Sequence, residues 1–183
     1  MLTQIFIDLG ANVGAVSKAF AQKNSACEIF CVEPNIHLIP SILAVAAELR
    51  RTINIIWSAA WTYDGIIDLY QSDADAASTI VDGKVEHSGW PQIDYTKSQL
   101  VPCFDFSSWM LRRFSLYDDI TVKMDIEGAE YDLLEKMLRD GSIRLVRKLI
   151  CEWHFDRYPA ISPERHRILK GHVSSMLSLE EWN

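Results

Sequence analysis

The stretch that decides the fold is Gln4-Ile-Phe-Ile-Asp-Leu-Gly-Ala-Asn-Val-Gly14, close to the start of the chain. Its first half is a short run rich in β-branched and aromatic residues, which is typical of a strand. Its second half is a turn with glycine at both ends, and residues 15–23 after it are good helix formers. The sequence therefore predicts a strand that leads through a tight turn into a helix.

Similar strand and helix segments alternate along much of the chain. Strands that alternate with helices of this length predict a parallel sheet covered on both faces. The predicted fold class is therefore α/β, a single doubly wound, mostly parallel sheet with an irregular insertion after the third strand. The later strands are predicted at residues 27–33, 53–58, 119–125 and 145–153, and the later helices at 35–51, 105–114, 128–140 and 162–177.

The insertion interrupts this alternation after the third strand. A strand-like stretch at 66–70 and a short strand at 99–103 flank a polar segment, residues 71–98. Long loops inside compact domains tend to carry function. We therefore expect residues 71–98 to form a lid or a ligand-binding loop, and residues 155–183 to form the helical tail of one domain that spans residues 1–183.

Composition and charge limit the class of protein. The formal net charge is −7 and the pI is about 5.2, and the basic clusters are short, which argues against binding of duplex nucleic acid. No apolar run reaches the ~18 residues of a membrane span. The four cysteines show no metal-binding spacing, which is typical of packing residues in a reducing compartment. We therefore expect a cytoplasmic protein with no membrane contact; the oligomeric state stays open.

The glycine turn indicates the kind of ligand. Dinucleotide-binding turns follow the pattern G-x-G-x-x-G, in which the second glycine lets the backbone approach a pyrophosphate. Here Asn12 replaces the second glycine and Ala15 the third. Asp8 also places a carboxylate at the end of the first strand, where it would repel a pyrophosphate. These features disfavour a nicotinamide dinucleotide and favour a ligand with positive charge and no phosphate.

S-Adenosylmethionine has those properties. Its sulfonium and amino groups are positive, and its carboxylate can bind the amides at the N-terminus of the first helix. Asn12 can adopt the positive φ of such a turn. Glu33 ends the second strand, where doubly wound folds place an acid for two ribose hydroxyls; the alternative is a solvated or capping acid. The predicted cofactor-binding residues are Asp8, Gly10, Ala11, Asn12, Gly14, Glu33, Asn35, Ala59, Ser78 and Asp125.

Several motifs together resemble the FkbM family of methyltransferases. They are Ile-Asp-Leu-Gly-Ala-Asn-Val-Gly at 7–14, Val-Glu-Pro-Asn at 32–35, Phe-Asp-Phe-Ser-Ser-Trp at 104–109, Val-Lys-Met-Asp-Ile-Glu-Gly-Ala-Glu at 122–130 and Cys-Glu-Trp-His at 151–154. The resemblance implies the Rossmann-like sheet of class I methyltransferases and O-methylation of small molecules and sugars. The tail after the fifth strand is short for the usual closing strand pair, so the sequence leaves the completeness of the sheet open.

Polar side chains at the ends of the fourth and fifth strands indicate where the reaction takes place. In the strand order that the resemblance implies, these two strands are neighbours. Asp125 ends the fourth strand, and Glu152 and His154 end the fifth. The latter two are two residues apart, so both side chains leave the same face. We therefore expect the three side chains to converge beside the cofactor.

Two roles are open for this group. It can hold a divalent cation such as Mg²⁺ or Mn²⁺, or Asp125 or His154 can act as general base. The alternative is a structural hydrogen bond between Glu152 and His154. Lys123 shares the strand face of Asp125 and is expected either to pair with a carboxylate there or to be a solvated strand lysine, while Glu127 is expected to be a capping acid like Glu130. The predicted catalytic residues are Asp125, Glu152, His154 and Lys123, and the predicted metal ligands are Asp125, Glu152 and His154.

The function predicted from these features is methylation of a hydroxyl on a small molecule or sugar by S-adenosylmethionine, with residues 71–98 as the lid or acceptor loop. One alternative is methylation of an RNA ribose hydroxyl, which would need a basic groove with aromatic stacking near Trp90. A second alternative is an inactive module that binds the cofactor without turnover. A nicotinamide-dependent oxidoreductase is the remaining competitor, and the glycine spacing weakens it.

Overall fold

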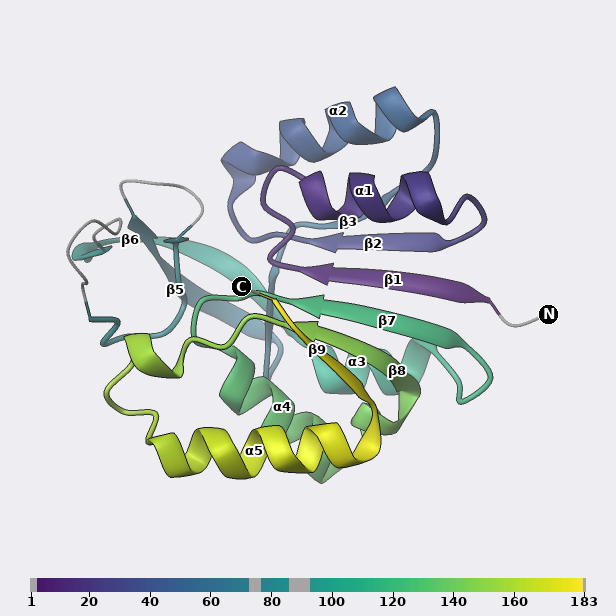
Figure 1. The fold of residues 1–183 in the computed structure, drawn as a ribbon. Coiled ribbons are helices and arrows are strands. Elements are labelled where there is room, and N and C mark those ends of the chain that lie inside the picture. The colour runs from purple at the N-terminus through teal and green to yellow at the C-terminus, as the bar shows by residue number, and fades with distance from the viewer. Residues whose placement is uncertain (1–2, 73–76, 86–92, 183) are drawn as a thin grey trace.

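The computed structural model describes residues 3–72, 77–85 and 93–182. Its main sheet has six strands in the order β3-β2-β1-β7-β8-β9, and every pair of neighbours in it is parallel (Figure 1). This confirms the predicted parallel sheet and the predicted contact between the strands that carry Asp125 and Glu152. The strands are β1 (Gln4–Leu9), β2 (Glu28–Val32), β3 (Asn54–Ile56), β7 (Asp119–Met124), β8 (Val146–Cys151) and β9 (Ser178–Glu181).

Among the described residues, five α-helices cover the two faces of this sheet. Helices α1 (Ala15–Lys23) and α2 (Ile39–Leu49) lie on one face, and α3 (Phe106–Arg113), α4 (Glu130–Asp140) and α5 (Pro163–Met176) lie on the other (Figure 1). The predicted doubly wound arrangement is therefore confirmed. Among the described helices, none is long and apolar enough to cross a membrane.

Strand β1 shows how the sequence divides the core between the two faces. Ile5, Ile7 and Leu9 are buried in the core cluster under α3, α4 and α5, while Phe6 is buried in the smaller cluster under α1 and α2. Successive side chains of β1 thus point to opposite faces of the sheet, as expected for a strand between two layers of helices. Asp8 has the parity of Phe6 and therefore points to the α1 face.

The insertion after β3 is a second sheet, which corrects the expectation of an irregular loop. It consists of β4 (Ala59–Trp61), β5 (Gly65–Ser72) and β6 (Ile93–Asp105) in the order β4-β6-β5, and it lies beyond the carboxyl ends of the main strands (Figure 1). Much of the described part of the predicted loop 71–98 is thus strand or bridge. At the start of β6, apolar and polar residues alternate only from Ile93 to Thr96, which is too short to stand out in a polar segment, and β6 pairs antiparallel with β5. Trp90 lies outside the described residues.

The end of the chain corrects the expectation of a purely helical tail at residues 155–183. Helix α5 is confirmed, and the Ser162 side chain caps it by accepting a hydrogen bond from the Arg165 amide at 3.1 Å. After it, β9 pairs in parallel with β8, and the Trp182 amide extends this ladder by donating to the Cys151 carbonyl at 2.9 Å. The main sheet therefore continues beyond the fifth predicted strand.

Candidate functional site

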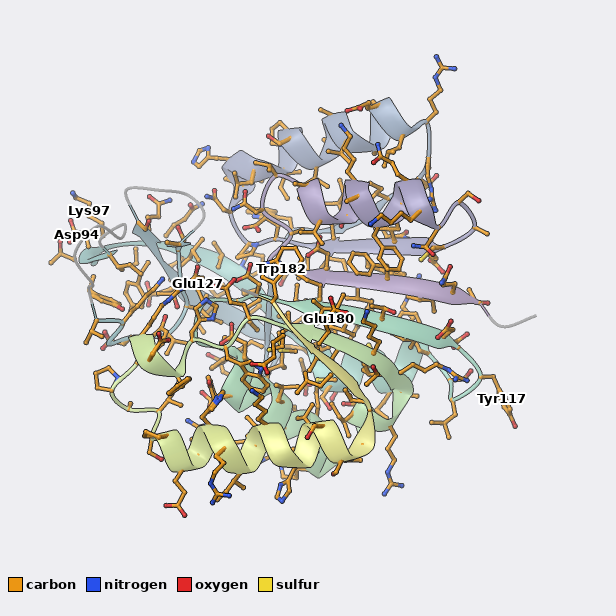
Figure 2. All side chains as sticks on the ribbon, viewed as in Figure 1. Asp94, Lys97, Tyr117, Glu127, Glu180 and Trp182 are labelled. Atoms are coloured by element: carbon orange, nitrogen blue, oxygen red, sulfur yellow. The ribbon has the colours of Figure 1, made fainter. Side chains whose placement is uncertain are left out.

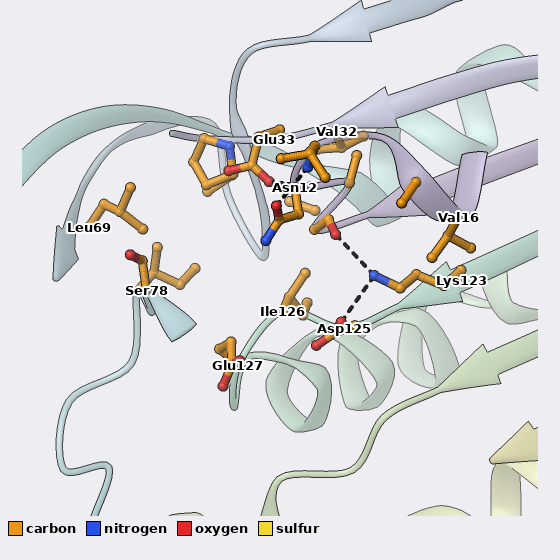
Figure 3. A pocket seen from close by; sticks show the side chains of 18 of the residues that line it. Asn12, Val16, Val32, Glu33, Leu69, Ser78, Lys123, Asp125, Ile126 and Glu127 are labelled. Atoms are coloured by element: carbon orange, nitrogen blue, oxygen red, sulfur yellow. Dashed lines mark hydrogen bonds and ion pairs between the residues drawn. The ribbon is translucent and has the colours of Figure 1, made fainter. Parts of the chain in front are cut away.

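A cavity of about 190 Å³ lies at the carboxyl ends of β1, β2 and β7, where open α/β sheets bind their ligands (Figure 3). Seven of the predicted cofactor-binding residues line it, and Asp8, Gly14 and Asn35 do not. The lining is Gly10, Ala11, Asn12, Val13, Ala15, Val16, Val32, Glu33, Pro34, Ala59, Ala60, Leu69, Ser78, Ile80, Lys123, Asp125, Ile126, Glu127 and Trp182.

The turn after β1 forms one wall of the cavity. Gly10, Asn12 and Gly14 have φ values of 73°, 51° and 79°, so the predicted left-handed conformation of Asn12 is confirmed. The amides of Gly10 and Ala11 both donate to the Val32 carbonyl, at 3.0 and 3.1 Å. A Cβ atom on Gly10 would lie 1.9 Å from the main-chain oxygen of Asp125. Glycine is therefore required here by both conformation and contact.

Glu33 joins this turn to the end of β2. Its Oε2 accepts a hydrogen bond from the Asn12 amide at 2.9 Å, and its Oε1 accepts one from the Asn35 amide at 2.8 Å. The side chain lines the cavity, and burial raises its pKa above the ordinary value. Asn35 caps the short helix that follows by accepting from the His37 amide at 3.0 Å. Glu33 thus has a local structural role as well as a position on the cavity wall.

Asp8 lies behind the cavity. It is fully buried on the α1 face, where the Ser17 hydroxyl donates to its Oδ2 at 2.7 Å. Its Oδ1 is 3.5 Å from the Lys123 Nζ atom. The structure therefore places Asp8 as a counter-charge for Lys123 instead of on the cavity wall where it was predicted, because the parity of β1 directs it under α1.

Lys123 connects the two strands that border the cavity. Its ammonium group donates to the Gly10 carbonyl at 2.9 Å and to Asp125 Oδ2 at 3.1 Å (Figure 3). Burial lowers the pKa of this lysine, but the carboxylates of Asp8 and Asp125 outweigh burial and raise it above the ordinary value. The expected pairing of Lys123 with a carboxylate is present, and it fixes the position of Asp125.

His154 lies at the centre of a group of carboxylates at the ends of β7 and β8. It is fully buried and does not line the cavity. Its Nδ1 atom is 3.0 Å from Glu130 Oε1, and its Nε2 atom is 3.4 Å from both Glu127 Oε2 and Glu152 Oε1 and 3.9 Å from Asp125 Oδ1. Burial lowers the pKa of His154, but Glu130 and the other carboxylates outweigh it and raise the pKa to about 10.

Glu127 is a residue of this group that the sequence did not assign to the site. It has a φ of 53° and lies on the cavity wall between Asp125 and the second sheet (Figures 2 and 3). Its carboxylate is 2.6 Å from Lys84 Nζ and 3.6 Å from Arg157 Nη1. The spacing of two residues between Asp125 and Glu127 could have indicated that Glu127 belongs to the site. Its ion pair with Lys84 could not have been predicted in this way, because Lys84 is distant in sequence.

Lys84 belongs to residues 77–85, here called the strap, which cross from the second sheet to the end of β7. Within the strap, the Thr79 hydroxyl donates to the Glu127 carbonyl at 2.6 Å, and the Val85 amide donates to the Arg157 carbonyl at 2.7 Å. The Tyr158 hydroxyl also donates to the Glu127 carbonyl. Ser78 and Ile80 of the strap line the cavity. The strap is thus part of the cavity wall, anchored by Glu127.

The structure confirms the expected capping role of Glu130 and shows that it also contacts His154. Its Oε1 and Oε2 accept hydrogen bonds from the amides of Ile126 and Gly128, both at 2.9 Å, and it is fully buried. The same Oε1 atom contacts His154. Glu130 therefore fixes the turn after β7 and the orientation of the imidazole ring at once.

The ligand types of this group are those of a divalent cation site. Atoms of Asp125, Glu127 and His154 lie within 4.8 Å of one another. Glu152 was predicted as the third ligand, and Glu127 takes that place in the group. Glu152 lies between His154 and Arg157, 3.2 Å from Arg157 Nη2. A histidine whose second nitrogen contacts a carboxylate is common at metal sites. Cationic side chains also surround the carboxylates, namely Lys84, Lys123 and Arg157.

The fold and the cavity define a Rossmann-like protein of the class I methyltransferase type. A family model described as the methyltransferase FkbM domain matches residues 8–172 of the 183-residue chain. The chain therefore belongs to the FkbM methyltransferase family, as the sequence motifs predicted. No curated protein and no solved structure gives a significant match.

Proposed function

We propose that this methyltransferase uses S-adenosylmethionine and methylates a hydroxyl group of a small molecule or sugar. The observation that carries the proposal is the charge of the cavity wall. Among the described residues that line the cavity, three are acids, Glu33, Asp125 and Glu127. One is a lysine, Lys123, and it is already paired with Asp8 and Asp125. Such a wall favours a ligand that has positive charge and no phosphate.

The residues present fit this cofactor at both of its polar ends. Each oxygen of Glu33 accepts one main-chain hydrogen bond and keeps capacity for another, which suits the two ribose hydroxyls. Ala15 and Val16 bring the N-terminus of α1 to the cavity, where amides can bind a carboxylate. A dinucleotide fits less well, because its pyrophosphate would face the acids of the wall.

The chain's own contribution to the reaction is to place and deprotonate the acceptor. When bound, S-adenosylmethionine supplies an electrophilic methyl group. Asp125 follows β7 directly and lines the cavity. A hydrogen bond from Lys123 orients its carboxylate. We assign it the role of accepting the proton from the acceptor hydroxyl. His154 is buried behind the wall, so its role is to hold Glu127 and Glu152 in position.

A divalent cation such as Mg²⁺ or Mn²⁺ is a second candidate for activating the acceptor. The grouping of Asp125, Glu127 and His154 favours it, and the His154 Nε2 atom makes no hydrogen bond to a described residue. The competing arrangement keeps His154 protonated and uses Lys84 and Arg157 as the cations of the cluster. In that arrangement a metal is unnecessary.

The experiment is a screen of acceptor pools with methyl-labelled S-adenosylmethionine, with and without EDTA. We expect label on a hydroxyl of a sugar or another small molecule, and no label in the Asp125→Asn variant. Label found on RNA alone would support the ribose alternative, and label on nitrogen or sulfur would contradict O-methylation. Loss of transfer with EDTA and its recovery with Mg²⁺ or Mn²⁺ would establish the cation, and full activity in EDTA would exclude it.

A further inference from the structure

Trp182 is brought to the cavity by the strand at the edge of the main sheet. The ladder between β8 and β9 pairs Cys151 with Glu181, and the next amide, that of Trp182, donates to the Cys151 carbonyl at 2.9 Å. Ion pairs of Glu180 with Lys148 and of Glu181 with Lys170 hold β9 in this register, at 2.5 and 2.8 Å. The main chain at Trp182 is thus positioned by regular strand pairing.

The indole is one wall of the cavity that holds Asp125 and Glu127. Among the described residues that line this cavity, Trp182 is the one aromatic side chain, and it is 39% exposed. Figure 2 shows Trp182 at the end of the strands where Glu127 lies, and Tyr117 at the other end of the strands. Trp182 thus lines the cavity, whereas Tyr117 is exposed and does not line it.

The surroundings of the indole favour a cation. The face of a tryptophan ring attracts positive charge more strongly than other aromatic rings do. The acids of the wall add to this attraction, and Lys123 opposes it little, since its ammonium group is bound to the Gly10 carbonyl and two carboxylates. An aromatic ring beside acids is an arrangement that suits a sulfonium ion.

We propose that Trp182 recognises the positive charge of the cofactor and so distinguishes it from the product. S-Adenosylmethionine has a sulfonium cation, and S-adenosylhomocysteine has a neutral thioether in its place. The indole attracts the first and not the second, which favours exchange of the product for fresh cofactor. This inference rests on the proposed function, because it requires that both ligands bind in this cavity.

The test is calorimetric binding of S-adenosylmethionine and S-adenosylhomocysteine to the wild type, Trp182→Leu and Trp182→Phe, in the absence of acceptor. We expect Trp182→Leu to weaken binding of S-adenosylmethionine about tenfold and to change binding of S-adenosylhomocysteine less than about twofold. Trp182→Phe keeps a ring and should show an intermediate loss. Tyr117→Leu, which removes an exposed aromatic ring far from the cavity, should change neither affinity.

Equal losses for the two ligands, or no loss for either, would overturn the role of Trp182 while leaving the proposed function intact. Failure of the wild type to bind both ligands would overturn the proposed function itself, and the inference with it. Circular dichroism of each variant is the control for correct folding. If Trp182→Leu does not fold, the ratio of the two affinities in Trp182→Phe decides, and an unchanged ratio would contradict the inference.

Discussion

The two ends of the cavity differ in the kind of groups that form them. At the end formed by β1 and β2, main-chain amides of Asn12 and Asn35 bind a single carboxylate, Glu33. At the end formed by β7 and β8, charged side chains meet in a cluster centred on His154. In the proposed function, the first end recognises the cofactor through hydrogen bonds, and the second controls charge and protons.

The difference also lies in where the residues come from. The first end uses a short part of the chain, from β1 to the start of α2. The second end combines the turn after β7, the end of β8, and Lys84 from the strap. A site made from adjacent residues tolerates little backbone change, whereas a site made from distant segments depends on the ion pairs that join them. The four predictions below test this difference.

The largest effect is expected where the two ends touch. Gly10→Ala forces a Cβ atom to within 1.9 Å of the Asp125 carbonyl oxygen and places alanine at a φ of 73°. The combined strain and overpacking should lower the free energy of unfolding by roughly 2–5 kcal/mol. Chemical denaturation measures it.

Gly141→Ala is the matched control, because Gly141 has a φ of 82° and no contacting atom of the described residues lies within 4 Å of the position that a Cβ atom would take there. It should cost only the strain of the left-handed conformation, roughly 1–2 kcal/mol. Equal losses for the two variants would show that β1 and β7 are less closely packed at Gly10 than the structure indicates.

The second prediction concerns the recognition end alone. Glu33→Ala would remove the two charge-assisted hydrogen bonds that we propose Glu33 makes to the ribose, which should weaken binding of S-adenosylhomocysteine by roughly 2–4 kcal/mol. Because Asp125 is untouched, transfer at saturating cofactor should be largely retained. Calorimetry and initial rates measure the two quantities. Unchanged affinity in a folded variant would mean that Glu33 serves only the turn.

The third prediction concerns the charged end. Asp125→Asn keeps the size of the side chain and removes its charge, so transfer should fall about 100-fold or more if the residue accepts the proton or binds a cation. S-Adenosylhomocysteine affinity should change little, which is the reverse of the result expected for Glu33→Ala. Full activity in Asp125→Asn would mean that the reaction takes place at another part of the cavity wall.

The smallest effect is expected at the strap. Lys84→Met leaves Glu127 with the more distant His154 and Arg157, at 3.4 and 3.6 Å, and because these partners remain it should lower the free energy of unfolding by only roughly 1–2 kcal/mol. Lys97→Met, which removes a lysine paired on the surface with Asp94 at 3.0 Å, should leave the midpoint of unfolding unchanged. If both variants behave alike, the ion pair between Lys84 and Glu127 does not anchor the strap.

The same difference explains what the sequence could predict. Gly10, Asn12 and Glu33 were predictable, because their roles depend on backbone conformation and on spacing within one strand–turn–helix unit. Asp125 and His154 could be brought together once the resemblance gave the strand order. Lys84 was not predictable, because nothing local relates the strap to the end of β7.

The sequence did not predict β4, β9 or the first half of β6, and the last two were missed for a different physical reason. Three of the four residues of β9 are exposed, and in the first half of β6 the alternation of apolar and polar residues extends only from Ile93 to Thr96 before exposed polar residues follow, so neither segment shows the sustained pattern that identifies a half-buried strand. Both are formed through pairing with a neighbour that is already in place. Trp182 was missed with β9, because its position on the cavity wall follows from that pairing.

The most direct test of the account is a calorimetric comparison of S-adenosylhomocysteine and NAD binding to the wild-type chain. The acidic wall and the turn around Gly10 and Asn12 predict that S-adenosylhomocysteine binds and that NAD does not. The Glu33→Ala variant should then lose most of the measured affinity. Tight binding of NAD with no binding of S-adenosylhomocysteine would contradict the assignment of the cavity to a methyl donor.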